Sequence, residues 1–195
     1  DRVLPSFREA LRGCSIKELE TYPQVVYGLD EELTLAYLNP EWSRFARDNG
    51  AGAEFDSRWS LGASLLDAIE GPSRQLYEQG LVRCLRSGEP WTHEYQCSSA
   101  SAYRRFRMYV NPIKSSRCLL VVNTLLVIGP HGRAGCRPHP AREELYRDAR
   151  GMIIQCSHCR RFQRVDDASL WDWVPDWIDQ RPEDTSGSFC PPCFD

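Results

Sequence analysis

Alternating apolar and polar positions in the middle of the chain predict β-strands. In the stretch 103–113, apolar side chains alternate with long polar ones: Phe106, Met108 and Val110 against Arg105, Arg107 and Tyr109. A period of two gives a strand one buried and one solvated face, which is typical of antiparallel sheets. The neighbouring stretches 90–99 and 117–129 are also predicted as strands, as are 25–27 and 33–39 near the start of the chain.

Helical spacing and helix-terminating residues predict the helices. The first covers 6–20, with an interruption at Gly13. A second helix should begin at Asn39-Pro40, with Asn39 as its cap and Pro40 in its first turn, and should end at Asn49-Gly50. A short apolar helix is expected at 60–69, and a longer one at 71–90, with Gly88 just past its end.

This order of elements predicts an α+β fold. Two strands are followed by several helices and then by three strands, so we expect one antiparallel sheet with helices gathered on one side. A βαβ repeat is missing from the sequence, and so are the glycine motifs that bind nucleotide phosphates. Nucleotide-binding folds are therefore disfavoured.

Breaks in the pattern suggest four parts. They are a helical cap at 1–22, a domain at 23–129, a linker with a short charged helix at 130–150, and a cysteine-containing module at 151–195. The linker is expected because 130–140 is rich in Gly, Pro and Arg.

Composition excludes several classes of protein. Hydrophobic residues make up 42% of the 195, enough for a packed core. The net charge of −3, with eight acidic and four basic residues in 151–195, disfavours binding to nucleic acid or an anionic membrane. No apolar run approaches the roughly 20 residues of a membrane span. Nine cysteines without an apolar signal segment predict reduced thiols and a cytoplasmic location.

Residues 23–129 resemble a PAS domain. The likeness rests on the element order and on the stretches "VVYGLDEELTLAYLNPEW", "LLDAIEGPSRQLYEQGLVRCLRSGEPWTHEY" and "RRFRMYVNPI". The resemblance implies a five-stranded antiparallel sheet with helices across one face. It also implies a sensory or interaction module, often dimeric, in which a small molecule is sometimes held between sheet and helices.

Two cofactor classes of that family do not fit the sequence. A flavin photosensor would need a reactive cysteine at 56–71, and a haem sensor commonly has a histidine on the helix at 71–90; neither is present. His93 is interpreted as a strand residue rather than a ligand. Cys84, Cys97 and Cys118 are interpreted as small core or edge residues, whereas Cys14 and Cys136 have no expected partner. An unidentified ligand in the PAS cavity stays open.

The strongest chemical signal is a pair of C-x-x-C motifs, Cys156/Cys159 and Cys190/Cys193, separated by 30 residues. Four cysteines arranged as two such turns supply the tetrahedral sulfur set of a structural Zn²⁺ site. Between them, 166–180 is predicted as a helix, starting near Trp173, with Trp171, Val174, Trp177 and Ile178 along one stripe. Tryptophans near 171–177 are candidate partner contacts, although packing is an equal alternative.

Rival interpretations of these cysteines are weaker. Covalent haem attachment needs C-x-x-C-H, but Arg160 follows Cys159. A thioredoxin-like site needs one pair, not two. An iron–sulfur cluster could use four cysteines, but paired turns favour zinc. His158, inside the first turn, is expected to point outward. Four sulfur ligands also leave no open position for catalysis.

The module resembles a small cysteine module that follows PAS or receiver domains in bacterial signalling proteins. The matching stretches are "IIQCSHCRRFQRVDDASLWDW" and "SGSFCPPC", although Gly187-Ser188 stands where that module has His-Gly. A nucleophile–base set for an enzyme cannot be assembled. The sequence thus predicts a signalling protein that acts through a homodimer or a protein partner, with a structural zinc. The alternatives are a redox sensor that uses the zinc cysteines and a small-molecule or haem sensor.

Overall fold

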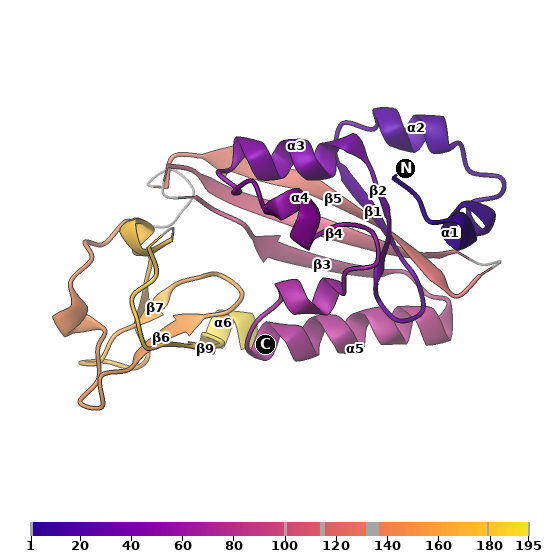
Figure 1. Cartoon of the computed structure of the whole chain (residues 1–195). Helices are drawn as coiled ribbons and strands as arrows, with labels where there is room; N and C mark the ends of the chain where they lie inside the picture. The colour runs from indigo at the N-terminus through magenta and orange to yellow at the C-terminus, as the bar shows by residue number, and fades with distance from the viewer. Residues whose placement is uncertain (1, 100, 114–115, 132–136, 179, 195) are drawn as a thin grey trace. The chain divides into compact units, whose positions relative to one another are not determined.

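The computed structural model divides the chain into two compact units (Figure 1). It describes residues 2–99, 101–113, 116–131, 137–178 and 180–194. The first unit comprises Asp1–Ile69, Leu76–His93 and Arg107–Thr124, and the second comprises Glu70–Gln75, Glu94–Phe106 and Leu125–Asp195. The domain boundaries expected from the sequence stay a prediction. The expected linker at 130–140 includes 132–136, and with them Cys136, which lie outside the described residues.

A five-stranded sheet organises residues 25–129 and confirms the predicted α+β fold. Its strands are β1 (Val25–Leu29), β2 (Leu35–Leu38), β3 (Trp91–Gln96), β4 (Tyr103–Ile113) and β5 (Cys118–Gly129). Their order is β2-β1-β5-β4-β3, so β5 lies at the centre, and the first strand, β1, lies between β2 and β5. It is antiparallel to both neighbours, with Tyr27 opposite Leu38 on one side and Val121 on the other. This is the PAS-like sheet that the resemblance implied.

The helices begin and end largely where the sequence indicated. They are α1 (Pro5–Ala10), α2 (Ile16–Thr21), α3 (Pro40–Asp48), α4 (Phe55–Arg58) and α5 (Pro72–Ser87). Left-handed glycines occupy the predicted breaks, with φ of +98° at Gly13, +82° at Gly50 and +69° at Gly88. These positive φ values suit glycine, which lacks the Cβ that makes them costly.

The short helix expected at 60–69 is smaller than predicted. Only Leu65–Ala68 is helical, as the 3₁₀ turn η1. The preceding residues form a turn and an isolated bridge between Ser64 and Thr34 instead. The Leu35 amide donates to the Ala63 carbonyl and the Gly62 amide donates to the Leu35 carbonyl, both at 2.8 Å. Pairing with the edge of β2 thus replaces the first turn of the helix.

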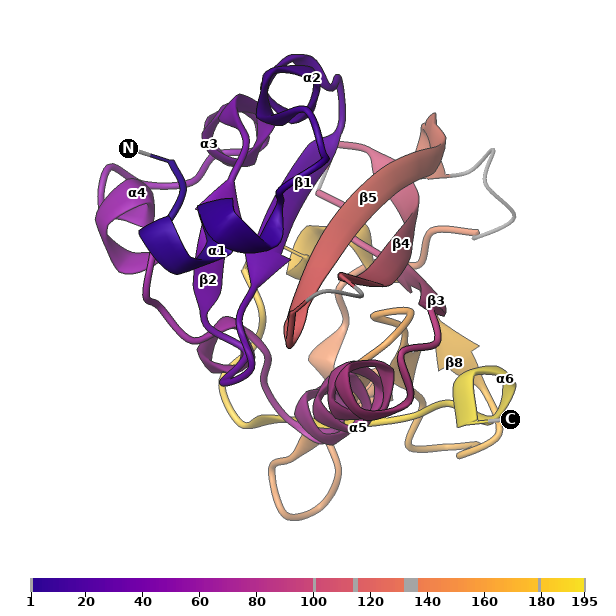
Figure 2. The same cartoon turned by 90° about the vertical axis from the view of Figure 1, so that its right-hand side faces the viewer.

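Alternate residues of β1 meet different helices, which places helices on both faces of the sheet. Tyr27 packs edge-on against Trp42 of α3, with ring centroids 5.3 Å apart. Its neighbour Val26 lies in a buried cluster with Phe7 and Leu11 from the α1 segment. Successive side chains of a strand point to opposite faces. Helix α1 therefore covers the face opposite α3, and Figure 2 shows it beside β1 and β2.

Asn39 precedes α3 as predicted but does not cap it. Pro40 begins the helix, and no side-chain hydrogen bond caps its amides from Asn39. The Asn39 side chain is fully buried and instead joins two strand ends: its Oδ1 accepts from the Val26 amide at 3.0 Å, and its Nδ2 donates to the Gln24 carbonyl at 2.7 Å. Tertiary pairing thus overrides the local capping preference.

A second, smaller sheet lies in the C-terminal part of the chain. It contains β6 (Ile153–Cys156), β7 (Phe162–Gln163), β8 (Trp171–Asp172) and β9 (Thr185–Ser188), in the order β8-β7-β6-β9. Strand β9 runs parallel to β6, whereas the other neighbours are antiparallel. The short helix α6 (Pro191–Phe194) follows.

The helices predicted around this sheet are wrong. In place of a helix over 166–180, the structure has strand β8 and the 3₁₀ turn η4 (Pro175–Trp177). Gln163 pairs with Trp171, and this ladder competes with a helix, while Pro175 has no amide hydrogen to continue one. The short charged helix predicted in the linker, over 141–150 within 130–150, is reduced to the 3₁₀ turn η3 (Glu143–Leu145).

In the part of the chain that the structure describes, no helix has both the length and the apolar character needed to cross a membrane.

Candidate metal centre

The structure brings the four predicted cysteine sulfurs together. The Sγ atoms of Cys156, Cys159, Cys190 and Cys193 all lie within 4.8 Å of one another. The sulfurs of Cys159 and Cys190 are 3.5 Å apart. Bonds of about 2.3 Å to a tetrahedral Zn²⁺ would separate the sulfurs by about 3.8 Å. The donor set therefore fits one metal ion, and metal binding itself stays a prediction.

The first pair sits on a tight turn between β6 and β7. The Cys156 amide donates to the Arg161 carbonyl at 2.7 Å, and the Arg160 amide donates back to the Cys156 carbonyl at 2.9 Å. Arg160 has a φ of +60°, which is uncommon for a residue with a side chain. This left-handed residue closes the turn and directs Cys156 and Cys159 to the same point.

The second pair reaches the first through the parallel strands. Because β9 runs beside β6, Ser188 lies opposite Cys156 (Figure 1). Cys190 follows two residues later, and its amide donates to the Cys156 Sγ at 3.4 Å. A single turn of α6 then presents Cys193, whose amide donates to the Cys190 carbonyl at 2.8 Å. The long spacing between the pairs is thus occupied by β7, β8, η4 and β9 rather than by the predicted helix.

Hydrogen bonds lower the pKa of the Cys156 thiol. Its pKa is lowered to about 4, first because the Cys159 thiol donates to its sulfur, and then because the backbone amides of Cys159, Cys190 and His158 do so. The same hydrogen bond raises the pKa of Cys159, and burial raises that of Cys193 to about 12. A bound cation would favour all four thiolates, since metal binding releases their protons.

A cluster of apolar and aromatic side chains is buried in the same unit as the four cysteines. Tyr146, Ile153, Phe162, Val174 and Trp177 form a buried group, in which the rings of Phe162 and Trp177 are 5.0 Å apart. Trp173 is buried as well, at 1% exposure. Packing therefore accounts for Trp173 and Trp177, which the sequence offered as alternative partner contacts.

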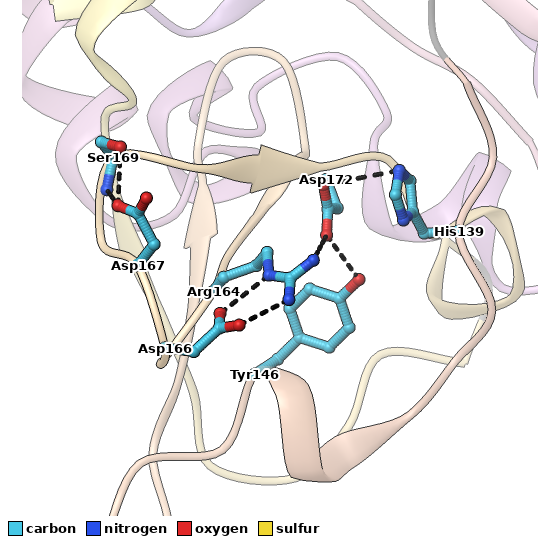
Figure 3. Close-up of polar contacts among 7 residues, drawn as sticks. All are labelled: His139, Tyr146, Arg164, Asp166, Asp167, Ser169 and Asp172. Carbon is cyan, nitrogen blue, oxygen red and sulfur yellow. Dashed lines mark hydrogen bonds and ion pairs between the residues drawn. The ribbon is translucent and has the colours of Figure 1, made fainter.

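A polar network joins the segments that flank the small sheet (Figure 3). The Tyr146 hydroxyl donates to Asp172 at 2.9 Å, and the Arg164 guanidinium lies 3.8 Å from the same carboxylate. His139 approaches it at 3.5 Å. Arg164 also donates two hydrogen bonds to Asp166, at 2.8 and 2.6 Å. Sequence reasoning missed His139 and Tyr146, whose only signal is their residue type.

The other singled-out residues lie apart from this centre. Cys84 is buried, and its thiol donates to the Val110 carbonyl at 3.7 Å; Cys97 and Cys118 are half-buried and Cys14 is exposed. His93 stacks on Trp91, at a centroid distance of 5.5 Å. His158 was expected to point outward, but its ring nitrogen meets the Glu94 carbonyl instead.

Space between the sheet and α3 is occupied by large side chains. The Tyr27 hydroxyl donates to the Met108 sulfur at 3.7 Å, and Trp42 packs on the Tyr27 ring. Tyr27 and Met108 are buried, at 5% and 1% exposure. These side chains therefore fill part of the space between sheet and helices in which a PAS domain would hold a small ligand.

Comparisons with solved structures give likenesses that cover between 54% and 65% of the chain. The PAS domain of the Cronobacter turicensis RpfR quorum-sensing receptor, in complex with C12:0, is 14% identical, with 54% of this chain and 96% of that chain covered and a TM-score of 0.41. The Bordetella pertussis BvgS PAS domain is 14% identical, with 63% and 86% covered and a TM-score of 0.38.

A sensory box sensor histidine kinase from Vibrio cholerae is 10% identical, with 65% of this chain and 100% of that chain covered and a TM-score of 0.39. No protein-family model matches the chain, and no curated protein matches it. Since these TM-scores are below 0.5, the description of the fold rests on the strand order of the sheet itself.

Proposed function

We propose that the chain is a sensory or adaptor part of a signalling protein, in which a PAS-like domain accompanies a four-cysteine zinc module. The observation that carries the proposal is the combination of the β2-β1-β5-β4-β3 sheet with four sulfurs within 4.8 Å. PAS-like sheets host sensing and association, whereas a fold alone does not determine a chemistry. The role is therefore argued from the site.

The proposed metal is a structural zinc, held by Cys156, Cys159, Cys190 and Cys193. Four thiolates satisfy the tetrahedral preference of Zn²⁺ and leave no position for a catalytic water. The strands around the site have only two to four residues each. A small sheet of this kind buries little apolar surface, so metal binding would supply much of its stability.

Metal analysis and an absorbance spectrum of the purified chain test this step. We expect one zinc per chain and no visible band, and Cys159→Ser should lower the metal content. Cys14→Ser is the matched control, because Cys14 is exposed and lies outside the sulfur cluster. A coloured protein that contains iron would contradict the zinc assignment and indicate a haem or an iron–sulfur centre instead.

The proposed output is association with a second copy or with a signalling partner, in the cytoplasm and without enzymatic activity. Eight acidic and four basic residues in 151–195 disfavour nucleic acid as the partner. Light scattering after size-exclusion chromatography should give twice the chain mass for a homodimer. A monomer would leave a different protein as the proposed partner.

A redox sensor is the second candidate, favoured by the 3.5 Å between the sulfurs of Cys159 and Cys190. A hydroperoxide would oxidise the two thiolates to one disulfide while its O–O bond breaks, and two protons would convert its oxygens to water and an alcohol. Zinc release on hydroperoxide treatment, reversed by a dithiol and fresh zinc, is the expected result. Retention of the metal would exclude this candidate.

A further inference from the structure

The turn that carries the first cysteine pair contacts other segments of the second unit. Residues 157–160, here called the knuckle turn, include Ser157 and His158 between the two cysteines and Arg160 directly after them. The Ser157 amide is already engaged, because it donates to the Ser188 carbonyl at 2.7 Å. The Ser157 carbonyl and the His158 and Arg160 side chains of the turn meet other segments.

One contact of the knuckle turn is with the start of α5. The Ser73 hydroxyl donates to the Ser157 carbonyl at 3.2 Å. A Cβ added at Gly71 would lie 3.6 Å from the Ser157 Oγ, so the turn approaches the Gly71 backbone at van der Waals distance. Gly187 approaches even more closely, at 2.6 Å by the same measure. Ser157 thus contacts two segments, 71–73 and 187–188.

The other contacts are with residues 94–99, which include the end of β3. The His158 Nε2 meets the Glu94 carbonyl, and because a carbonyl only accepts, this nitrogen carries the proton. The Arg160 Nη1 donates to the Ser98 carbonyl at 3.4 Å. Ser98 is 5% exposed, and its hydroxyl accepts from the Arg104 amide at 3.1 Å. Two side chains of the turn therefore hold two carbonyls of 94–99.

We propose that metal binding at the four cysteines controls the order of residues 94–99 through the knuckle turn. Metal bonds at Cys156 and Cys159 fix the two ends of the segment 157–158. This places the His158 side chain on the Glu94 carbonyl and the Arg160 side chain on the Ser98 carbonyl. Without the metal, the turn regains conformational entropy and those contacts open. The segment then responds to the state of the metal centre. The proposal rests on the proposed metal site but not on its being zinc.

Hydrogen exchange of the full chain, with zinc and after chelation, measures this directly. Amides in 94–99 should exchange roughly tenfold faster without metal, as expected for the loss of one or two hydrogen bonds. Amides of β1 in the first unit should keep their rates. Metal analysis of the same samples reports binding separately.

The double variant His158→Ala/Arg160→Gly tests the route. Glycine suits the left-handed position of Arg160, so the variant should still bind one metal per chain. Its 94–99 amides should exchange at the same rate with and without metal. The control Arg150→Gly removes an exposed arginine that pairs with Asp148 and should keep the response of the unmodified chain.

The outcomes separate the two proposals. A chain that binds one metal but shows no change at 94–99 overturns the coupling alone. A double variant whose 94–99 amides still respond to the metal also overturns it, because the response then travels by another route. A chain that binds no metal overturns the metal site, and the coupling with it.

Discussion

At the scale of single residues, Asn39 shows how one buried amide links elements that are distant in sequence. Its side chain is fully buried and bonds the Val26 amide and the Gln24 carbonyl, so it fastens the start of β1 to the start of α3. A buried backbone group that loses its hydrogen-bond partner destabilises the folded protein by about 1–3 kcal/mol.

Replacement of Asn39 by alanine should therefore lower the free energy of unfolding by about 2–4 kcal/mol, since an amide and a carbonyl lose their partner together. Urea denaturation followed by circular dichroism measures the change. Asn49→Ala, at the exposed end of α3, is the control and should change stability by less than about 1 kcal/mol. Equal effects of the two variants would contradict the role assigned to Asn39.

Asp166 gives the residue scale a pH-dependent test. Its pKa is lowered from the ordinary 3.8 mainly because Arg164 donates hydrogen bonds to it. A carboxyl group with a lowered pKa stabilises the fold above its unfolded pKa, and that stabilisation is lost as the pH falls through its folded pKa. The contribution should thus be present at neutral pH and disappear in acid.

Thermal unfolding of the unmodified chain and Asp166→Asn should show this sign. The variant should melt at a lower temperature near neutral pH, and the gap should close as the pH falls through the lowered pKa of Asp166. Asp176→Asn, which changes an exposed aspartate of the same unit, controls for net charge. A gap that widens in acid would contradict the direction of the pKa change.

At the scale of elements, the packing of α1 on the sheet depends on a glycine. A Cβ added at Gly28 of β1 would lie 2.1 Å from the Cζ of Phe7, which is 1% exposed. Gly28→Ala should therefore displace the ring and destabilise the first unit by about 1–3 kcal/mol. Denaturant unfolding measures this.

The companion variants make the test specific. With Phe7→Leu, the smaller side chain leaves room, so the two substitutions together should destabilise less than the sum of their separate effects. Gly129→Ala is the matched control within a strand, because its added Cβ meets nothing within 4 Å. Strict additivity of Gly28→Ala and Phe7→Leu would show that the ring is not what the glycine accommodates.

Elements with a strong period could be predicted from the sequence, and elements made by pairing could not. The alternation in β4 and the glycine stops of α3 and α5 are local signals, and the structure follows them. Strands β7 and β8 have two residues each and exist because Phe162 and Gln163 pair with Asp172 and Trp171. The tryptophans between 171 and 177 occur at a spacing that is typical of a helix, but the buried ones among them pack in the core of the second unit and do not share a helix face.

The same contrast applies to the site. Four cysteines in two motifs predicted the sulfur cluster, because the ligand type and the spacing within each motif can be read directly from the sequence. The parallel pairing of β6 with β9, which brings the motifs together, left no sequence signal. The contacts of His158 and Arg160 left no sequence signal either, because both side chains donate to carbonyls of a distant segment.

At the scale of the whole molecule, the two units should respond differently to the metal. The first contains the cluster around Phe7 and Val26, and the second contains the cluster around Tyr146 and Trp177 together with the four cysteines. Because only one unit would hold a metal, chelation should lower the stability of that unit by mass action and leave the other unchanged.

Calorimetry of the full chain should accordingly show two transitions, of which a chelator lowers only one. Asn39→Ala should lower the midpoint temperature of the transition that the chelator leaves unchanged, because Asn39 belongs to the first unit. Asp166→Asn should lower the midpoint temperature of the transition that the chelator affects, because Asp166 belongs to the second unit. Strands β4 and β5 run through both units, so a single transition that moves as a whole with the metal is the contrary result. It would mean that the continuous strands couple the two units, which then unfold in one cooperative transition.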